Sequence, residues 1–272
     1  MDIITPEMRF DKVILTYGYP LISKEVSEAI YYARRINHSH QKEPAWRRRQ
    51  LIASPDDPEY GTSMFRKRQW LPLARDLPAM IGGYCCEKTK KSPVHKYQHK
   101  NKVKPIFGTL AEESRLRTSA WIKTGCNSFE GQKAASKPLS FWTEQDILQY
   151  LSDYGIKIAS VYGDIVGEPG NLHCTGCTRT GCVFCGFGAH LEKGETRFQR
   201  LARTHPKQYE YCIGGGQWSE NPHYDPDAPE YDGEWKNWNP KMIWTPSKEG
   251  LGMGKLFDMV NEIYGKELIR YK

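Results

Sequence analysis

Four of the eight cysteines lie in the stretch His173-Cys174-Thr-Gly-Cys177-Thr-Arg-Thr-Gly-Cys182-Val-Phe-Cys185-Gly-Phe-Gly188, as two Cys-x-x-Cys pairs. Such a pair places two thiolates on the same side of a tight turn, which suits a zinc ion or one corner of an iron–sulfur cluster. Cysteine also serves as a small buried hydrophobe. Because these four cysteines fall so close together, the stretch favours a metal or cluster site over packing.

The sequence contains neither an apolar leader at its N-terminus nor a run of about eighteen apolar residues. We therefore expect a cytoplasmic protein that does not span a membrane. Thiols stay reduced in the cytoplasm, so clustered cysteines indicate metal ligands or catalytic groups rather than disulfides. At 272 residues the chain is long enough to bury a substantial core.

The net charge of +7 is concentrated in residues 31–104, which carry 17 Lys and Arg against 6 Asp and Glu. Such an excess indicates a partner rich in phosphate, either a nucleotide or a nucleic acid, although a solvated basic face gives the same pattern. Trp46, Phe65 and Trp70 are interleaved with the basic residues, as in surfaces that stack on nucleobases. A helical insertion with aromatic core contacts remains the alternative.

Local patterns predict short strands and helices in alternation. Apolar spacing, capping residues and glycines give these expected elements: a helix over 10–17, a strand at Leu21–Ile22, a helix at Lys24–Arg35 capped by Ser23, a buried strand at 104–108, a helix behind a capping box at Thr143, and an amphipathic helix over 256–263. We therefore expect an α/β protein.

A second cysteine motif is the adjacent pair Cys85-Cys86, followed by Lys88, Lys90 and Lys91. Adjacent cysteines rarely bond to each other, because their Cα atoms are too close for good disulfide geometry. Two neighbouring thiolates can, however, bind two different irons of one cluster. Nearby lysines would lower the thiol pKa values and compensate the negative charge of a cluster.

The segment from Gly108 to Arg117 combines a glycine turn with a helix start that carries Ser114 and Arg117. A helix N-terminus next to the end of a strand is suited to anions, and an arginine binds a phosphate or sulfate through two hydrogen bonds. A surface helix with internal Glu–Arg pairs is the alternative interpretation.

These motifs together resemble the phosphoadenosine phosphosulfate (PAPS) reductase family, within the adenine-nucleotide α-hydrolase-like, PP-loop ATPase superfamily. Four segments carry the resemblance over residues 10–188: Cys85-Cys86-x-x-x-Lys90-x-x-Pro93, Gly108 through Ser114 and Arg117, Pro138-Leu…Trp142-Thr143…Asp146-Ile147…Tyr150, and Gly181-Cys182-x-x-Cys185. The residues from Arg179 to Gly188 look most like the phage and mobile-element branch of the family.

The resemblance implies an α/β domain at 1–188, whose incomplete, mostly parallel sheet is flanked by helices, with a basic insertion at about 37–80. A helical and loop extension would follow at 189–272. An adenylylated or sulfated nucleotide would bind at the carboxyl edge of the sheet. The residues that match the nucleotide or sulfate site are Lys90, Gly108, Glu113, Ser114 and Arg117.

In the adenylylsulfate-reducing relatives, a double cysteine and a Cys-x-x-Cys pair hold a [4Fe–4S] cluster. The matching ligands in this sequence are Cys85, Cys86, Cys182 and Cys185. The alternative is one zinc ion on Cys174, Cys177, Cys182 and Cys185. Zinc ribbons usually separate their Cys-x-x-Cys halves by a dozen or more residues, whereas only four separate them here, so we favour the cluster.

Two departures from the family affect the functional prediction. The Ser-x-Gly-Gly-Lys-Asp-Ser phosphate loop of the family has no counterpart here, and the catalytic C-terminal cysteine is also missing, since Cys212 does not match its setting. We therefore expect a C-terminal half or remnant of an enzyme, with a PP-loop-bearing subunit as its partner, and assign no catalytic residue. If it turned over, it would act as an oxidoreductase or a sulfurtransferase.

Three functions remain open at this point. The first is a sulfonucleotide-reductase-like protein that binds a sulfonucleotide and a [4Fe–4S] cluster. The second is a sulfur-transfer component that acts on DNA or tRNA, contacted through the basic region at 31–104. The third is a non-catalytic, metal-stabilised module that binds nucleic acid.

Overall fold

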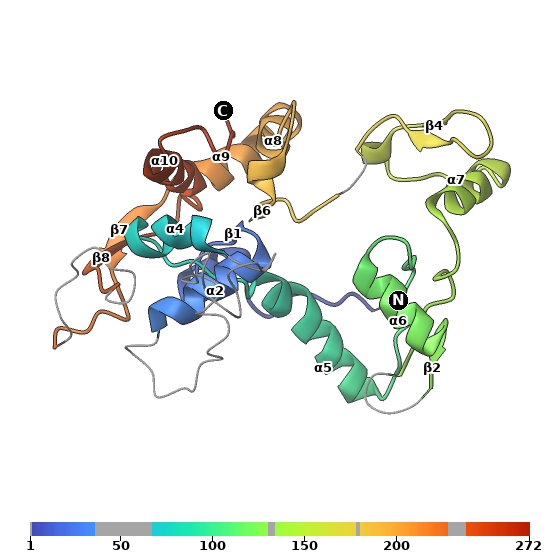
Figure 1. Cartoon of the computed structure of the whole chain (residues 1–272), viewed down its shortest axis with the longest axis horizontal. Helices are drawn as coiled ribbons and strands as arrows, with labels where there is room; N and C mark the ends of the chain where they lie inside the picture. Colours follow the sequence, from blue (N-terminus) through green and yellow to red (C-terminus); the bar gives the residue numbers. More distant parts are fainter. Residues whose placement is uncertain (1, 36–66, 130–133, 178–179, 228–237) are drawn as a thin grey trace. The chain divides into compact units, whose positions relative to one another are not determined.

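The computed structural model describes residues 2–35, 67–129, 134–177, 180–227 and 238–272. Within them the chain is a mixed α/β protein of helices and short parallel and antiparallel strands (Figure 1). It divides into two compact units, the first made of Met1–Pro93 and Cys182–Lys272 and the second of Val94–Gly181. Trp46, Phe65 and much of the predicted basic insertion lie outside the described residues.

A small parallel sheet belongs to the first unit. Strand β1 (Leu21–Ile22) pairs in parallel with β6 (Gly186–Phe187), and Leu21 lies opposite Gly186. Both residues of β1 are buried, as expected for a strand that is covered on both faces. A Cβ atom on Gly186 would overlap the carbonyl oxygen of Pro20, so glycine permits the close approach of the two strands.

Isolated bridges extend this pairing through residues 79–81. Ile81 bridges Tyr19 and Ala79 bridges Trp244, both in parallel. Trp244 belongs to β8 (Met242–Thr245), which pairs antiparallel with β7 (Gln217–Glu220). The first unit therefore joins strand segments from both ends of the sequence in one series of mostly parallel pairings.

The helices and 3-10 turns of the first unit are α1 (Phe10–Tyr17), α2 (Lys24–Arg35), η1 (Arg68–Trp70), α4 (Leu71–Asp76), η4 (Ala189–Leu191), α8 (Arg197–Thr204), α9 (Pro206–Ile213) and α10 (Met253–Tyr264). Their apolar faces meet in one large buried cluster. Phe198 of α8 and Phe257 of α10 place their ring centroids 5.0 Å apart in it. The blue and cyan N-terminal elements accordingly pack with the orange and red C-terminal ones (Figure 1).

Arg34, near the end of α2, is a buried cation within this unit. Its guanidinium donates hydrogen bonds of 2.7–2.9 Å to four backbone carbonyls, those of Leu73, Ala74, Leu77 and Ala79. The carbonyls at the end of α4 have no partner within the helix, so Arg34 satisfies groups that would otherwise be buried without one. The same guanidinium lies 3.9 Å from the centre of the Trp238 ring.

The second unit consists of short elements with little burial. It contains most of α5 (Ser92–Asn101), followed by α6 (Arg115–Thr124), β2 (Asn127–Ser128), β3 (Ala135–Ser136), α7 (Glu144–Asp153), the 3-10 turn η3 (Ser160–Tyr162), β4 (Ile165–Val166) and β5 (His173–Cys174). The pairs β2–β3 and β4–β5 are antiparallel. Among its described residues only four are buried, namely Ala111, Ser140, Leu148 and Leu172.

Several local predictions are confirmed. Helices α1, α2 and α10 and strand β1 lie where the sequence places them. Ser23 caps α2 by accepting a hydrogen bond of 3.1 Å from the Val26 amide. Thr143 and Asp146 form the expected capping box at the start of α7.

Two other predictions differ from the structure. Residues 104–108 do not form a buried strand, because only a single bridge links Ile106 to Ser136 and the Ile106 side chain is exposed. The structure also draws no boundary at residue 188. Residues 189–272 share their core with the N-terminal helices, and the second unit is instead the internal segment 94–181.

None of the helices in the described part of the chain is long and apolar enough to cross a membrane.

Candidate functional site

The adjacent cysteines stand at the start of a helical run. Cys85 and Cys86 have helical backbone and lead into the π-helical turn η2 (Glu87–Lys91), which continues into α5. π-Helical turns are rare and frequently occur at functional sites. The Thr89 hydroxyl donates a hydrogen bond of 2.7 Å to the Cys85 carbonyl within this turn.

A glycine fixes the approach to these cysteines. Ile81 bridges Tyr19, and Gly82 follows directly. A Cβ atom on Gly82 would overlap the Tyr17 carbonyl oxygen, so any other residue would push this segment away from its neighbour. The backbone before Cys85 is therefore held closely against the end of α1.

The second pair, Cys182 and Cys185, precedes β6. The Cys185 amide donates a hydrogen bond of 3.1 Å to the Cys182 carbonyl, which closes the turn between them. Cys182 is exposed, whereas Cys185 is partly buried. Because β6 pairs with β1, this turn belongs to the first unit, as do Cys85 and Cys86.

The two cysteine pairs act on one another electrostatically. The pKa of Cys85 is raised to about 11, mainly by burial and in part by Cys185, Cys182 and Cys86. Burial also raises the pKa of Cys185, and Cys182 adds to that effect. Sulfurs that lie about a hundred positions apart in the sequence thus act on one another in the folded chain.

Lys90 lies among these thiols. Cys182 is the main cause of the raised pKa of Lys90. Cys86 and Cys185 also act on Lys90 and favour its charged form. A lysine in this position stabilises thiolates, which are the form that binds metals.

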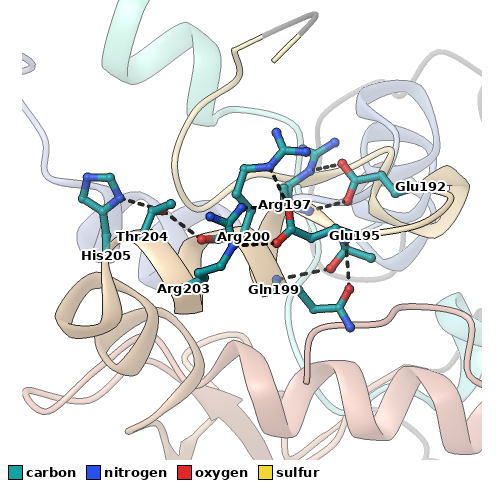
Figure 2. A network of polar contacts seen from close by, with 9 residues as sticks. Glu192, Glu195, Arg197, Gln199, Arg200, Arg203, Thr204 and His205 are labelled. Atoms are coloured by element: carbon teal, nitrogen blue, oxygen red, sulfur yellow. Dashed lines mark hydrogen bonds and ion pairs between the residues drawn. The ribbon is translucent and has the colours of Figure 1, made fainter. Parts of the chain in front are cut away.

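Arg197, the first residue of α8, is the second cation at the cysteines. Its guanidinium donates a hydrogen bond of 3.0 Å to the Cys185 carbonyl and lowers the pKa of that thiol. Glu192 holds Arg197 in place, because its carboxylate accepts bonds of 2.7 Å from Nε and 3.0 Å from the Arg197 amide (Figure 2).

The remainder of this network stabilises α8 (Figure 2). Thr196 and Gln199 form a capping box at its N-terminus, and Glu195 pairs with both Arg200 and Arg203. Arg197 and this cap are not among the site residues predicted from the sequence. The sequence does contain a signal for the cap, because Gln199 follows Thr196 by three residues, which is the spacing of a capping box.

The remaining four cysteines are divided between the two units. Cys174 and Cys177 belong to the second unit, as does Cys126. Cys212 is buried in the core, 3.6 Å from the Met253 sulfur, and burial raises its pKa to about 12. Among the described residues, no cysteine forms a disulfide bond.

Within the described ranges, no three His, Cys, Asp or Glu side chains are grouped so that they could hold a metal ion. This finding concerns ligands that surround a single ion. In a [4Fe–4S] cluster each cysteine binds a different iron, so the four sulfurs lie farther apart.

The segment from Gly108 to Arg117 belongs to the second unit, whereas Lys90 belongs to the first. Ser114 caps α6 by accepting a hydrogen bond of 3.3 Å from the Arg117 amide. Arg117 forms an ion pair with Glu113, whose carboxylate also accepts a bond from the Leu110 amide. The predicted anion-binding arginine is therefore occupied by an internal carboxylate.

No protein-family model matches the sequence, and no curated protein or solved structure is significantly similar to it. The likeness to the PAPS reductase family therefore depends on the four motifs alone.

Proposed function

We propose that the chain is an iron–sulfur protein of sulfonucleotide-reductase type, in which Cys85, Cys86, Cys182 and Cys185 hold a [4Fe–4S] cluster. The observation that supports this proposal is that Cys182 and Cys185 act on the pKa of Cys85, and Cys182 on that of Lys90, with all four residues in the first unit. The two pairs are about a hundred positions apart in the sequence.

The chemistry of these residues fits such a group. Thiolates are soft ligands that favour iron–sulfur clusters and zinc. Buried thiols resist deprotonation, and the cations Lys90 and Arg197 offset this cost by stabilising the thiolate forms. When bound, the cluster would supply a redox-active centre of net negative charge.

The second part of the proposal is a nucleotide-binding fold, with an anion site at the start of α6. We propose an adenine-nucleotide α-hydrolase-like fold, which the parallel pairings of β1, β6 and residues 79–81 support. Ser114 and Arg117 would bind the sulfate or phosphate of an adenylylated nucleotide at the start of α6. Arg117 would exchange Glu113 for that anion.

A serine series tests the cluster. We expect anaerobically purified Cys85→Ser and Cys182→Ser variants to lose nearly all iron and acid-labile sulfide. Cys126→Ser and Cys177→Ser are matched controls that should keep both, since these thiols belong to the second unit. If Cys177→Ser lost its metal as fully as Cys182→Ser, and that metal were zinc, the zinc assignment would replace the cluster.

Calorimetric titration with adenosine 5′-phosphosulfate tests the nucleotide site. Arg117→Met should abolish binding, whereas Glu113→Gln should tighten it by up to about fivefold, because a partly exposed ion pair is worth roughly 0.2–1 kcal/mol. Unchanged affinity in Arg117→Met would contradict the role of this arginine and leave the cluster assignment intact.

A further inference from the structure

A second feature of the chain, separate from the cysteines, is a basic surface at the end of α5. Residues 94–111 contain no Asp or Glu. We define the α5 basic surface by five exposed side chains of this segment: His95, His99, Lys100, Lys102 and Lys104. All of them belong to the second unit.

The geometry of α5 places these groups together. His95 and His99 are four positions apart, so they share one side of the helix, and Lys100 follows in its last turn. Lys102 and Lys104 extend the positive charge beyond the helix end. In the part of the chain that the structure describes, no carboxylate forms an ion pair with Lys100, Lys102 or Lys104.

Lys102 has an unfavourable backbone conformation. Its φ is +53°, and the Val103 amide donates a hydrogen bond of 3.1 Å to the Gln98 carbonyl. This is the bond of a Schellman cap, in which the left-handed residue is usually glycine, because a Cβ atom costs roughly 1–2 kcal/mol there. Strained residues of this kind cluster at functional sites, which makes Lys102 a candidate for a functional side chain.

Exposed apolar groups lie next to the charges. Ile106 and Phe107 follow Lys104 within three residues and are exposed, with Phe107 anchored through its amide to the Ser136 carbonyl at 2.8 Å. Lysines that contact a phosphate backbone beside an aromatic ring are the combination that binds unpaired bases. Lysine provides point charges rather than bidentate base contacts, so recognition would not depend on sequence.

We propose that the α5 basic surface and Phe107 bind single-stranded nucleic acid through its phosphate backbone and one stacked base. This surface goes beyond the proposed cluster and does not depend on it. The chain would then bind a nucleic-acid strand in addition to the adenylylated nucleotide proposed above.

Fluorescence anisotropy with a labelled single-stranded oligonucleotide tests the proposal. We expect binding by the full chain to weaken with salt, and Lys100→Gln/Lys104→Gln to reduce the slope of log K against log salt by about 1.4, since each phosphate contact contributes about 0.7. Lys255→Gln/Lys266→Gln removes the same charge from exposed positions of the first unit and should leave the slope unchanged. Equal losses in both variants would overturn the proposal.

Two single variants sharpen the test. Lys102→Gly should raise the thermal midpoint, because it relieves the left-handed strain, and yet lower the salt slope by about 0.7. Phe107→Ala should weaken binding by about fivefold or more at constant salt slope. Unchanged binding in Lys102→Gly, or equally tight binding of inorganic polyphosphate, would overturn the proposal, whereas iron content should be unaffected in every variant.

Discussion

The first unit contains both hydrophobic clusters found among the described residues, whereas the second buries only Ala111, Ser140, Leu148 and Leu172. Twelve of the exposed large hydrophobic side chains belong to the second unit, among them Leu116 and Phe129. Burial of apolar area is the main source of stability in folded proteins. The first unit is therefore stabilised by its core, and the second depends more on caps and backbone hydrogen bonds.

This difference also bears on function. The four proposed cluster ligands all belong to the well-packed unit. The predicted anion segment and the α5 basic surface belong to the weakly packed unit. Rigid surroundings suit a cluster with fixed geometry, whereas exposed side chains suit ligands that bind from solvent.

The largest expected effect is at Arg34. Arg34→Met should lower the free energy of unfolding of the first unit by about 3–5 kcal/mol, because four buried carbonyls lose their donor. Chemical denaturation followed by tryptophan fluorescence measures this change. Arg203→Met, which removes an exposed ion pair with Glu195, is the control and should have no measurable effect. Similar losses of unfolding free energy in both variants would contradict the role of Arg34 as a buried hydrogen-bond donor.

A glycine pair compares the packing of the two units directly. Gly18 and Gly125 both have positive φ, of 91° and 65°. A Cβ atom on Gly18 would lie 2.5 Å from the Met80 carbonyl carbon, whereas one on Gly125 would meet nothing within 4 Å. Gly18→Ala should therefore cost about 3 kcal/mol or more and Gly125→Ala only about 1 kcal/mol, measured by thermal unfolding. Equal losses of stability in the two variants would show that the two glycines do not differ in how closely their surroundings are packed.

The smallest expected effect is a difference in pH dependence. Burial lowers the pKa of His190 in the first unit below 6.5, so the unfolded state binds more protons and stability falls as the pH drops below about 6.5. Hydrogen bonds from Thr143 lower the pKa of Asp146 in the second unit, so its contribution is lost only as the pH falls below 3.8.

Thermal midpoints between pH 7.5 and pH 5 measure the histidine effect. His190→Gln should flatten the dependence in this range, and Asp146→Asn should leave it as steep as in the wild type. A dependence in His190→Gln as steep as in the wild type would show that another group titrates there.

Much of the local structure could be predicted from the sequence. The caps at Ser23 and Thr143 and strand β1 follow from neighbouring residues, because caps and short apolar runs are local signals. The strand expected at 104–108 was also predicted from a local signal, and that prediction is wrong. An apolar run predicts burial only if another part of the chain covers it, and Ile106 is exposed.

Long-range features could not be predicted in this way. Arg34 looks like an ordinary cation in the last turn of an amphipathic helix, and only the fold shows that it reaches the carbonyls of α4. Likewise, nothing near Cys185 in the sequence indicates that Arg197 donates a hydrogen bond to its carbonyl while Glu192 holds Arg197 in place. The grouping of Cys85 with Cys182 was inferred from motif likeness, and the structure adds that Cys182 and Cys185 contribute to the raised pKa of Cys85.

The most direct test of the central claim is the metal and sulfide content of the wild-type chain after anaerobic purification. Iron, zinc and acid-labile sulfide are measured against protein concentration, together with the electron paramagnetic resonance spectrum of the reduced protein. We predict a brown protein with about four irons and four sulfides per chain. A colourless protein with one zinc per chain, and without sulfide, would contradict the account.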